Sequence, residues 1–233
     1  MKCLFAVFLF FFFIFAARAQ AALVNLTEER QVVWNVLSAE DASGEFVVKK
    51  TLTGQEASKI SLVKEGEQVL LFASSGGAER VADVTGYTRE IVEVEHKEAP
   101  SVIKIYANED SFQIDQGGVV AVTRFPIYID TDSREFSIRT NSGEHFLSVL
   151  PREVFNSLIR LKVITSLGGD GSFEITEGGL GELSYVVKGK RKIEVLNIAE
   201  FDVPVTASVS AATGQLIKIN QPVWLSVLGF MFG

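Results

Sequence analysis

The chain has 233 residues, and its 29 acidic residues outnumber its 22 Lys and Arg residues, which gives a formal net charge of −7. A field of this sign repels the phosphate backbone and excludes nucleic acid as an expected partner. The single cysteine, Cys3, lies in the apolar N-terminal segment, so the rest of the chain has no disulfide, thiolate or cysteine–metal chemistry. The fold must therefore be held together by buried apolar surface.

Residues 1–19 have the pattern of a secretory signal peptide. Lys2 is followed by a stretch without polar residues, Cys3 to Ala17, and Ala17-Arg18-Ala19 provides a small-x-small cleavage site after Ala19. Fifteen helical residues span about 22 Å, which is shorter than the ~30 Å core of a bilayer. An uncleaved anchor is the alternative, although Arg18 interrupts it. We expect an exported protein of the periplasm, cell surface or extracellular medium, peripheral to a membrane if its C-terminal tail binds one.

Residues 20–98 are predicted to form a β-rich region. Acidic residues followed by Val32, Val33, Val36 and Leu37 favour a helix near residues 28–37, although the Val and Trp content there also fits a strand. A hairpin with a Gly-containing loop at 65–67 is expected. The predicted strands of this region cover residues 45–50, 59–64, 68–72 and 89–95.

Residues 99–221 are predicted to combine a β-meander with a helix packed on an antiparallel sheet. Pro151 suits a first helical turn, and the apolar residues of 151–161 fall on one side of a helix. Val203, Val205, Ala207 and Val209 alternate with polar residues, which predicts a strand with one buried face. The predicted strands cover residues 102–106, 112–114, 119–122, 127–129, 135–139, 144–150, 183–188, 193–198, 203–209 and 215–219. Asp115-Gln116-Gly117-Gly118 is expected to form a hairpin turn, and the three strands between residues 127 and 150 are expected to form the meander. The expected fold class is α+β with mostly antiparallel β structure, followed by an apolar tail at 222–233.

No catalytic motif emerges. Ser61 and Lys64 form a Ser-x-x-Lys pair within a strand pattern, where residues three apart point to opposite faces. His96 and His145 lack further ligands at metal-site spacing, and Asp130-Thr131-Asp132 begins a calcium-loop pattern that Glu135 breaks. We therefore expect no cofactor, no metal and no enzyme. A hydrolase that uses carboxylates brought together by the fold is the less favoured alternative.

The C-terminal region resembles a PepSY-like module, on the helix at 151–161, the strand Leu183 to Gly189 and the closing hairpin around Ser210-Ala211-Ala212-Thr213-Gly214. This family places a helix on an antiparallel sheet, and the resemblance covers about residues 150–220. Here Ser210 stands where the family usually has Asp, and the stretch before Pro204 is longer than a minimal module needs. The resemblance implies binding or regulation, usually inhibition of a peptidase, without a catalytic residue.

Two segments are candidates for contact with a membrane or a partner. The only basic cluster is Lys188, Lys190, Arg191 and Lys192, which is typical of a charged hairpin tip or of a contact for anionic lipid or an acidic partner. The uncharged tail could complete the core, lie in a membrane interface or bind a partner protein. Its candidate contact residues are Trp224, Leu225, Leu228, Phe230 and Phe232.

These features together predict a non-enzymatic binding or regulatory module of the cell envelope or surface that modulates a peptidase. The expected partner is an exported peptidase or an envelope protein, and the tail is a candidate for contact with the membrane surface. A structural or assembly role on the cell surface is the alternative. If the protein binds peptide by strand addition, its structure should show an unprotected sheet edge.

Overall fold

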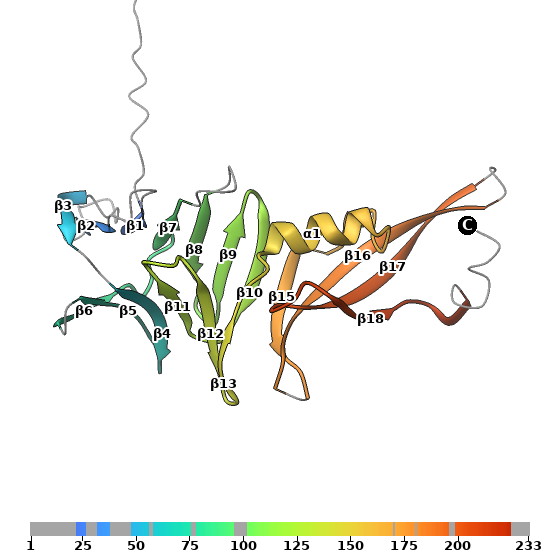
Figure 1. The fold of residues 1–233 in the computed structure, drawn as a ribbon. Coiled ribbons are helices and arrows are strands. Elements are labelled where there is room, and N and C mark those ends of the chain that lie inside the picture. Colours follow the sequence, from blue (N-terminus) through green and yellow to red (C-terminus); the bar gives the residue numbers. More distant parts are fainter. Residues whose placement is uncertain are drawn as a thin grey trace, which may run out of the picture.

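The computed structural model describes residues 22–26, 32–37, 48–55, 58–75, 78–95, 102–169, 171–179, 181–195 and 199–224. These residues contain eighteen strands and a single helix in an elongated molecule (Figure 1). The predicted α+β class is therefore wrong, because the described structure is dominated by two sheets and its helix has only ten residues. One short helix can cover only part of one sheet face, so sheet-on-sheet packing supplies most of the core.

The larger sheet, sheet A, has twelve strands. Adjacent strands are antiparallel except for the pairs β1–β7 and β10–β15, which are parallel. In spatial order the strands are β18 (Leu216–Asn220), β17 (Ala199–Ser210), β16 (Leu183–Val195), β15 (Ser172–Glu177), β10 (Val119–Thr123), β9 (Phe112–Gln116), β8 (Ile103–Ala107), β7 (Val92–Val94), β1 (Val24–Leu26), β2 (Val32–Leu37) and β3 (Val48–Gln55), and β14 (Ser166–Leu167) pairs with β16 outside this path.

The smaller sheet, sheet B, has six antiparallel strands. In spatial order they are β13 (Gly143–Phe146), β12 (Phe136–Thr140), β11 (Ile127–Asp130), β4 (Lys59–Glu65), β5 (Gln68–Ser75) and β6 (Ala78–Asp83). Both sheets join strands from the two sides of residue 98, where the sequence predicted a boundary between regions. In sheet A the neighbours β7 and β8 pair across that position.

The helix α1 (Pro151–Arg160) confirms the predicted helix at 151–161. Pro151 occupies its first turn, and the carboxylate of Glu153 accepts a 3.0 Å hydrogen bond from the backbone N–H of Leu150. This bond satisfies one of the donors that a helix start leaves unpaired. Val154 and Leu158, four residues apart, are buried against the core. The N-terminus of the helix lies beside the β9–β10 turn, where Gln116 accepts from the N–H of Arg152.

One face of sheet A carries a continuous buried row of side chains. The row follows the registered pairs across eight strands and consists of Val92, Ile105, Ile114, Ala121, Phe173, Val187, Ala207 and Ile219. The first seven are at most 1% exposed, whereas Ile219, on the terminal strand β18, is 41% exposed. The row is therefore buried along its whole length except at the edge strand β18, where its last side chain is exposed to solvent.

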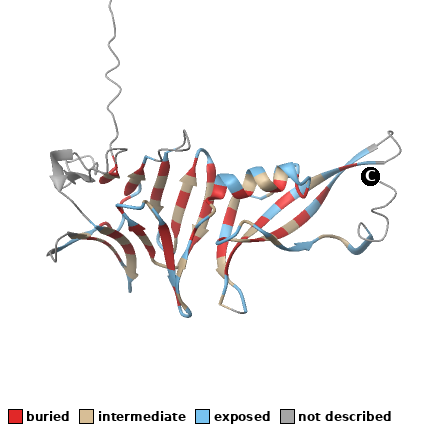
Figure 2. Cartoon of the chain, in the orientation of Figure 1, coloured by how far each residue is buried: buried red, intermediate tan, exposed pale blue. Residues whose placement is uncertain are grey.

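The other face of sheet A is half exposed and carries residues such as Lys104, Gln113, Val122 and Val186. Sheet B and α1 must therefore cover the same, buried face, and their apolar residues form one cluster with it. Figure 2 shows the resulting alternation of buried and less buried positions along the strands. The strict alternation predicted for 203–209 is confirmed, because Val203, Val205, Ala207 and Val209 are buried.

Several local predictions are confirmed. The hairpin predicted around residues 65–67 joins β4 and β5, and the turn at 115–118 joins β9 and β10. The backbone of Gly66, Gly117 and Gly118 has positive φ, which glycine adopts without strain. The meander predicted from residue 127 is β11, β12 and β13.

Other predictions are corrected by the structure. The helix expected near residues 28–37 is wrong, because residues 32–37 form β2, which pairs with β1 and β3. Backbone pairing with a strand on each side makes this segment a strand, although its sequence was compatible with either a helix or a strand. The two strands expected at 183–188 and 193–198 belong to a single strand, β16, which runs to Val195. Residues 196–198 lie outside the described residues. β6 and β15 were not expected as strands at all.

Candidate functional site

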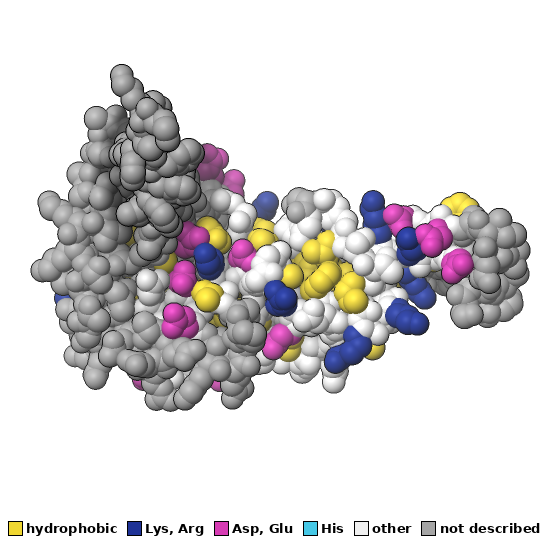
Figure 3. Space-filling view, turned by 90° about the horizontal axis from the view of Figure 1, so that it is seen from above, with side chains coloured by type: hydrophobic (Ala, Val, Ile, Leu, Met, Phe, Trp, Pro, Cys, Tyr) yellow, Lys and Arg dark blue, Asp and Glu magenta, His cyan; other side chains and the backbone are white. Residues whose placement is uncertain are grey.

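The predicted basic cluster lies inside β16 and not at a hairpin tip. Alternate residues of a strand share a face, so Lys188, Lys190 and Lys192 lie on one face of β16 and Arg191 lies on the other. The Nζ atom of Lys192 lies 2.6 Å from the carboxylate of Glu200 on β17, and this hydrogen bond raises the pKa of Lys192. Seen from above, Lys and Arg side chains lie along the arm of β16 and β17 with acidic side chains near its end (Figure 3). The two-stranded arm formed by β16 and β17 therefore carries both basic and acidic side chains and is not a purely basic surface.

The predicted contact residues of the tail are only partly described. Trp224 is 47% exposed, so it does not fill a core gap. Leu225, Leu228, Phe230 and Phe232 lie outside the described residues, and their contact roles stay predictions. No helix in the described part of the chain is both long and apolar enough to span a membrane.

The motifs that the sequence analysis set aside hold no catalytic arrangement. Ser61 and Lys64 both lie in β4, so their side chains leave opposite faces of the strand. Asp130 closes a β-turn, since its Oδ1 accepts from the backbone N–H groups of Asp132 at 3.0 Å and Ser133 at 2.7 Å. No group of His, Cys, Asp and Glu residues suited to a metal ion occurs among the residues described. His96 lies outside them.

A cleft of about 600 Å³ lies between the two sheets near their terminal strands. One wall is β13, from which the consecutive residues Glu144, His145 and Phe146 all line the cleft. The side chains of consecutive strand residues point to opposite faces of a sheet. Because all three residues line the cleft, the cleft must run along the edge of β13 and not over one of its faces. The opposite wall is the β17–β18 turn with Leu216 and Ile217 at the start of β18.

The β13 wall offers unpaired backbone groups. The N–H of Leu147 donates a 2.8 Å hydrogen bond to the carbonyl oxygen of Phe136, which fixes the phase of the β12–β13 ladder. In an antiparallel ladder the bonded pairs alternate, so Glu144 and Phe146 direct their N–H and C=O groups away from β12. β13 has no other strand beside it in the described structure. Its free edge can therefore accept a further strand.

The β18 wall is the terminal strand of sheet A and is exposed along most of its length. Ile217 is 54% exposed and Ile219 is 41% exposed, while Lys218 between them is in register with Ser208. An added strand would extend the sheet and continue the buried row that ends at Ile219. The predicted condition for strand addition, an unprotected edge, is thus met at β18 and β13.

The segment between β13 and α1 fixes the two walls relative to each other. The N–H of Val149 donates to the carbonyl oxygen of Ala211 at 3.1 Å, and the carbonyl of Val149 accepts from the buried hydroxyl of Tyr185 at 2.8 Å. Gly214, in the β17–β18 turn, has φ of +68°, and a Cβ at this position would lie 3.2 Å from Cγ2 of Val149. Close packing of this kind makes the cleft a preformed feature.

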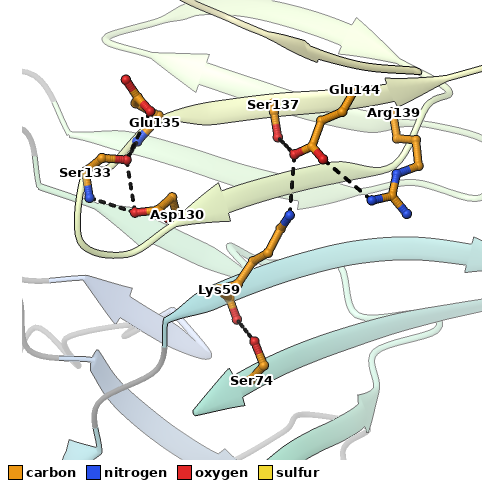
Figure 4. A network of polar contacts seen from close by, with 8 residues as sticks. All are labelled: Lys59, Ser74, Asp130, Ser133, Glu135, Ser137, Arg139 and Glu144. Carbon is orange, nitrogen blue, oxygen red and sulfur yellow. Dashed lines mark hydrogen bonds and ion pairs between the residues drawn. The ribbon is translucent and has the colours of Figure 1, made fainter. Parts of the chain in front are cut away.

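Glu144 is held in place by a network on the outer face of sheet B (Figure 4). Its Oε1 accepts from Ser137 Oγ at 2.5 Å and lies 3.4 Å from Lys59 Nζ, and its Oε2 lies 3.6 Å from Arg139 Nη2. The Ser137 hydrogen bond and then these positive charges hold the pKa of Glu144 below its ordinary value, against partial desolvation. Lys59 and Arg139 also flank the ring of Tyr128, with Nζ and Cζ at 4.8 and 4.6 Å from its centroid.

The tip of the β12–β13 hairpin contains a Ser–His pair that the sequence analysis missed. Ser142 Oγ lies 2.9 Å from His145 Nε2, and the neighbouring Thr140 donates a 2.9 Å bond to Glu177 on β15. The pKa of Glu177 is lowered by hydrogen bonds from Ser142 and Thr140. The carboxylate thus contacts the hydroxyls, whereas a catalytic triad requires it to orient the histidine. The arrangement links the two sheets, and its only signal in the sequence was the i, i+3 spacing between a turn residue, Ser142, and His145 in the strand that follows.

Six of the described carboxyl groups have a pKa that departs from the ordinary value, and in each it is lowered, namely Asp83, Glu90, Asp110, Asp130, Glu144 and Glu177. A general acid at neutral pH needs the opposite shift. The cleft itself presents backbone groups along the edge of β13 and apolar side chains at Phe146, Leu216 and Ile217.

No protein-family model, curated protein or solved structure matches the chain. The described elements of residues 150–220 are α1 followed by β14 to β18, in which β15 to β18 form an antiparallel run. The resemblance of this region to a PepSY-like module stays a prediction.

Proposed function

We propose that the protein is an exported, non-enzymatic binding module that takes up an extended segment of a partner protein by strand addition at β18. The observation that carries the proposal is the buried row of sheet A, which ends on the exposed side chain of Ile219 at an edge that pairs with no further strand among the described residues. A peptide strand beside β18 would gain main-chain hydrogen bonds and bury Ile219. One end of it would reach the cleft, where Phe146 and Ile217 are more than half exposed.

The charge of Lys218 favours a partner protein over a second copy of the chain. Two β18 strands paired antiparallel and centred on Lys218 would bring two ammonium groups directly opposite each other, which is destabilising. Lysine in an exposed edge strand is a common safeguard against such pairing. A partner segment can avoid this repulsion, because its own residue opposite Lys218 is free to differ. Regulation of an exported peptidase, which the PepSY-like resemblance implies, would be one use of such capture.

The proposal is tested by selection from a random nine-residue peptide library against the protein spanning residues 20–233. Selected peptides are then synthesised, and their affinity is measured by fluorescence anisotropy for the wild type and for Ile219→Lys. Val81→Lys is the matched control, because Val81 is a similarly exposed residue of the other terminal strand of sheet B, β6. Hydrogen exchange of the complex reports which strand gains protection.

We expect peptides whose binding protects residues 217–220 from exchange and weakens at least tenfold in Ile219→Lys but not in Val81→Lys. Binding that is unaffected by Ile219→Lys, or a selection that yields no peptide, would show that this edge does not capture partners. Sedimentation of the wild type as a dimer that Ile219→Lys dissociates would show instead that the edge pairs with a second copy, as an assembly role requires.

A further inference from the structure

The charged side chains that line the cleft are all acidic. Its lining includes two carboxylates, Glu144 and Glu182, and no Lys or Arg. The remaining lining residues are apolar, such as Phe146, Leu216 and Ile217, or carry hydroxyl, amide or imidazole groups. A strand that enters this cleft from β18 therefore meets apolar surface and negative charge together.

The two carboxylates differ in how far they are already neutralised. Glu144 lies between Ser137, Lys59 and Arg139, so its charge is largely compensated (Figure 4). Glu182 is exposed, and none of the described basic side chains lies within ion-pair distance of its carboxylate. The backbone carbonyl of Glu182 accepts a 2.8 Å bond from Gly178, which fixes this residue at the start of β16. Its carboxylate is thus an anchored negative charge that a ligand can pair.

We infer that the captured segment carries a Lys or Arg residue that pairs with Glu182, next to apolar residues that cover Phe146, Leu216 and Ile217. This inference rests on the proposed strand addition and specifies its partner. The net charge of −7 acts in the same direction at long range, because an acidic protein attracts basic segments and accelerates their association. An acidic segment would instead place like charges together inside the cleft.

The test uses the peptide selection described above, run in parallel against the wild type and Glu182→Gln. Glu67→Gln is the matched control, because Glu67 is an exposed glutamate in the β4–β5 turn. Peptides selected on the wild type should be enriched in Lys and Arg and depleted in Asp and Glu, and this bias should be clearly weaker in peptides selected on Glu182→Gln, which retains only the long-range attraction of the net negative charge. A synthetic peptide whose basic residue is replaced by Gln should bind the wild type about two- to fivefold more weakly, as expected for an exposed ion pair.

The same replacement should make no difference to binding by Glu182→Gln, and it should retain its full effect in Glu67→Gln. Raising the salt concentration should reduce the difference between the two peptides, since exposed charges are screened. Selected peptides without basic enrichment, whose binding is still lost in Ile219→Lys, would overturn the charge preference and leave strand addition intact. Binding that is insensitive to both Ile219→Lys and Glu182→Gln would remove both.

Discussion

The buried hydroxyl of Tyr185 on β16 donates a 2.8 Å hydrogen bond to the carbonyl oxygen of Val149, which lies 36 positions earlier in the chain. Val149 belongs to the segment that leads from β13 of sheet B to α1. The ring of Tyr185 packs edge-on against Phe173, with centroids 6.4 Å apart. This one side chain therefore joins the core of sheet A to the segment that packs between the two walls of the cleft.

Replacing Tyr185 with Phe should destabilise the protein by about 1–2 kcal/mol, because the partly buried carbonyl of Val149 loses its side-chain donor. The free energy of unfolding is measured by urea denaturation. Tyr106→Phe is the control, since its half-exposed hydroxyl makes only a 3.3 Å bond to Glu90 and water can replace it. Equal effects of the two substitutions would mean that the Val149 bond contributes little. A Tyr185→Phe variant that folds should also bind peptide more weakly if the bond fixes the cleft.

Gly189 allows β16 to pass close under the segment that follows α1. A Cβ at this position would lie 2.5 Å from Cγ2 of Ile164 and 3.0 Å from the carbonyl oxygen of Ser166. Gly189→Ala should therefore cost about 1–3 kcal/mol through overpacking. The loss caused by Gly189→Ala should be smaller in an Ile164→Ala background, because alanine lacks the Cγ2 atom that a Cβ at residue 189 would meet. Additive effects of the two substitutions in urea denaturation would contradict the close approach.

Stability should fall in acid partly through Glu144. Its folded-state pKa is lowered, first by the Ser137 hydrogen bond, so its stabilising effect is present above the unfolded pKa of about 4.3 and is lost as the pH falls through the folded value. The effect should be below about 1 kcal/mol, because the side chain is partly exposed and screened by solvent. Glu144→Gln should give a shallower decrease of stability between neutral pH and pH 3 than Glu67→Gln. Identical pH profiles would exclude a role of this carboxylate in acid sensitivity.

The membrane-interface interpretation of the tail predicts binding to vesicles through Trp224 and the lysines of β16. The protein spanning residues 20–233 should co-sediment with vesicles of phosphatidylcholine and phosphatidylglycerol, and Trp224→Ala or truncation after Gln221 should reduce this binding, since exposed Trp partitions into the interface. Lys188→Gln together with Lys190→Gln should reduce binding to anionic vesicles only. Unchanged sedimentation of the truncated protein would exclude the tail as a membrane contact.

Local patterns in the sequence were sufficient for the elements whose partners lie close along the chain. Pro151 and the apolar spacing after it predicted α1, and the glycines at 66, 117 and 118 predicted two hairpins. The alternation from Val203 to Val209 identified the buried face of β17. In each case a periodicity or a turn residue acts over a few positions, so its effect can be read without knowledge of the fold.

The candidate site could not be predicted in the same way. Phe146 and Ile217 are 71 positions apart, and they line one cleft only because β13 and β18 end their sheets near each other. Whether a strand lies at an edge depends on which strands pair with it, and a strand pattern such as that of Leu216 to Asn220 looks the same at an edge and at the centre. The basic cluster shows the same limit. Gly189 and the charges around it suggested a hairpin tip, but pairing with β17 keeps this segment in the middle of the long strand β16.

By itself the sequence determined a cysteine-free body, strands with one buried face, one amphipathic helix and an acidic surface, because these properties depend on composition and short periodicities. Only the tertiary structure decided that residues 32–37 form a strand, that β10 and β15 pair in parallel, and that the row from Val92 to Ile219 ends on the terminal strand of sheet A. The physical reason is that strand pairing is made by backbone groups common to all residues. Its partners are therefore selected by the packing of the whole chain, on which the free edge at Ile219 depends.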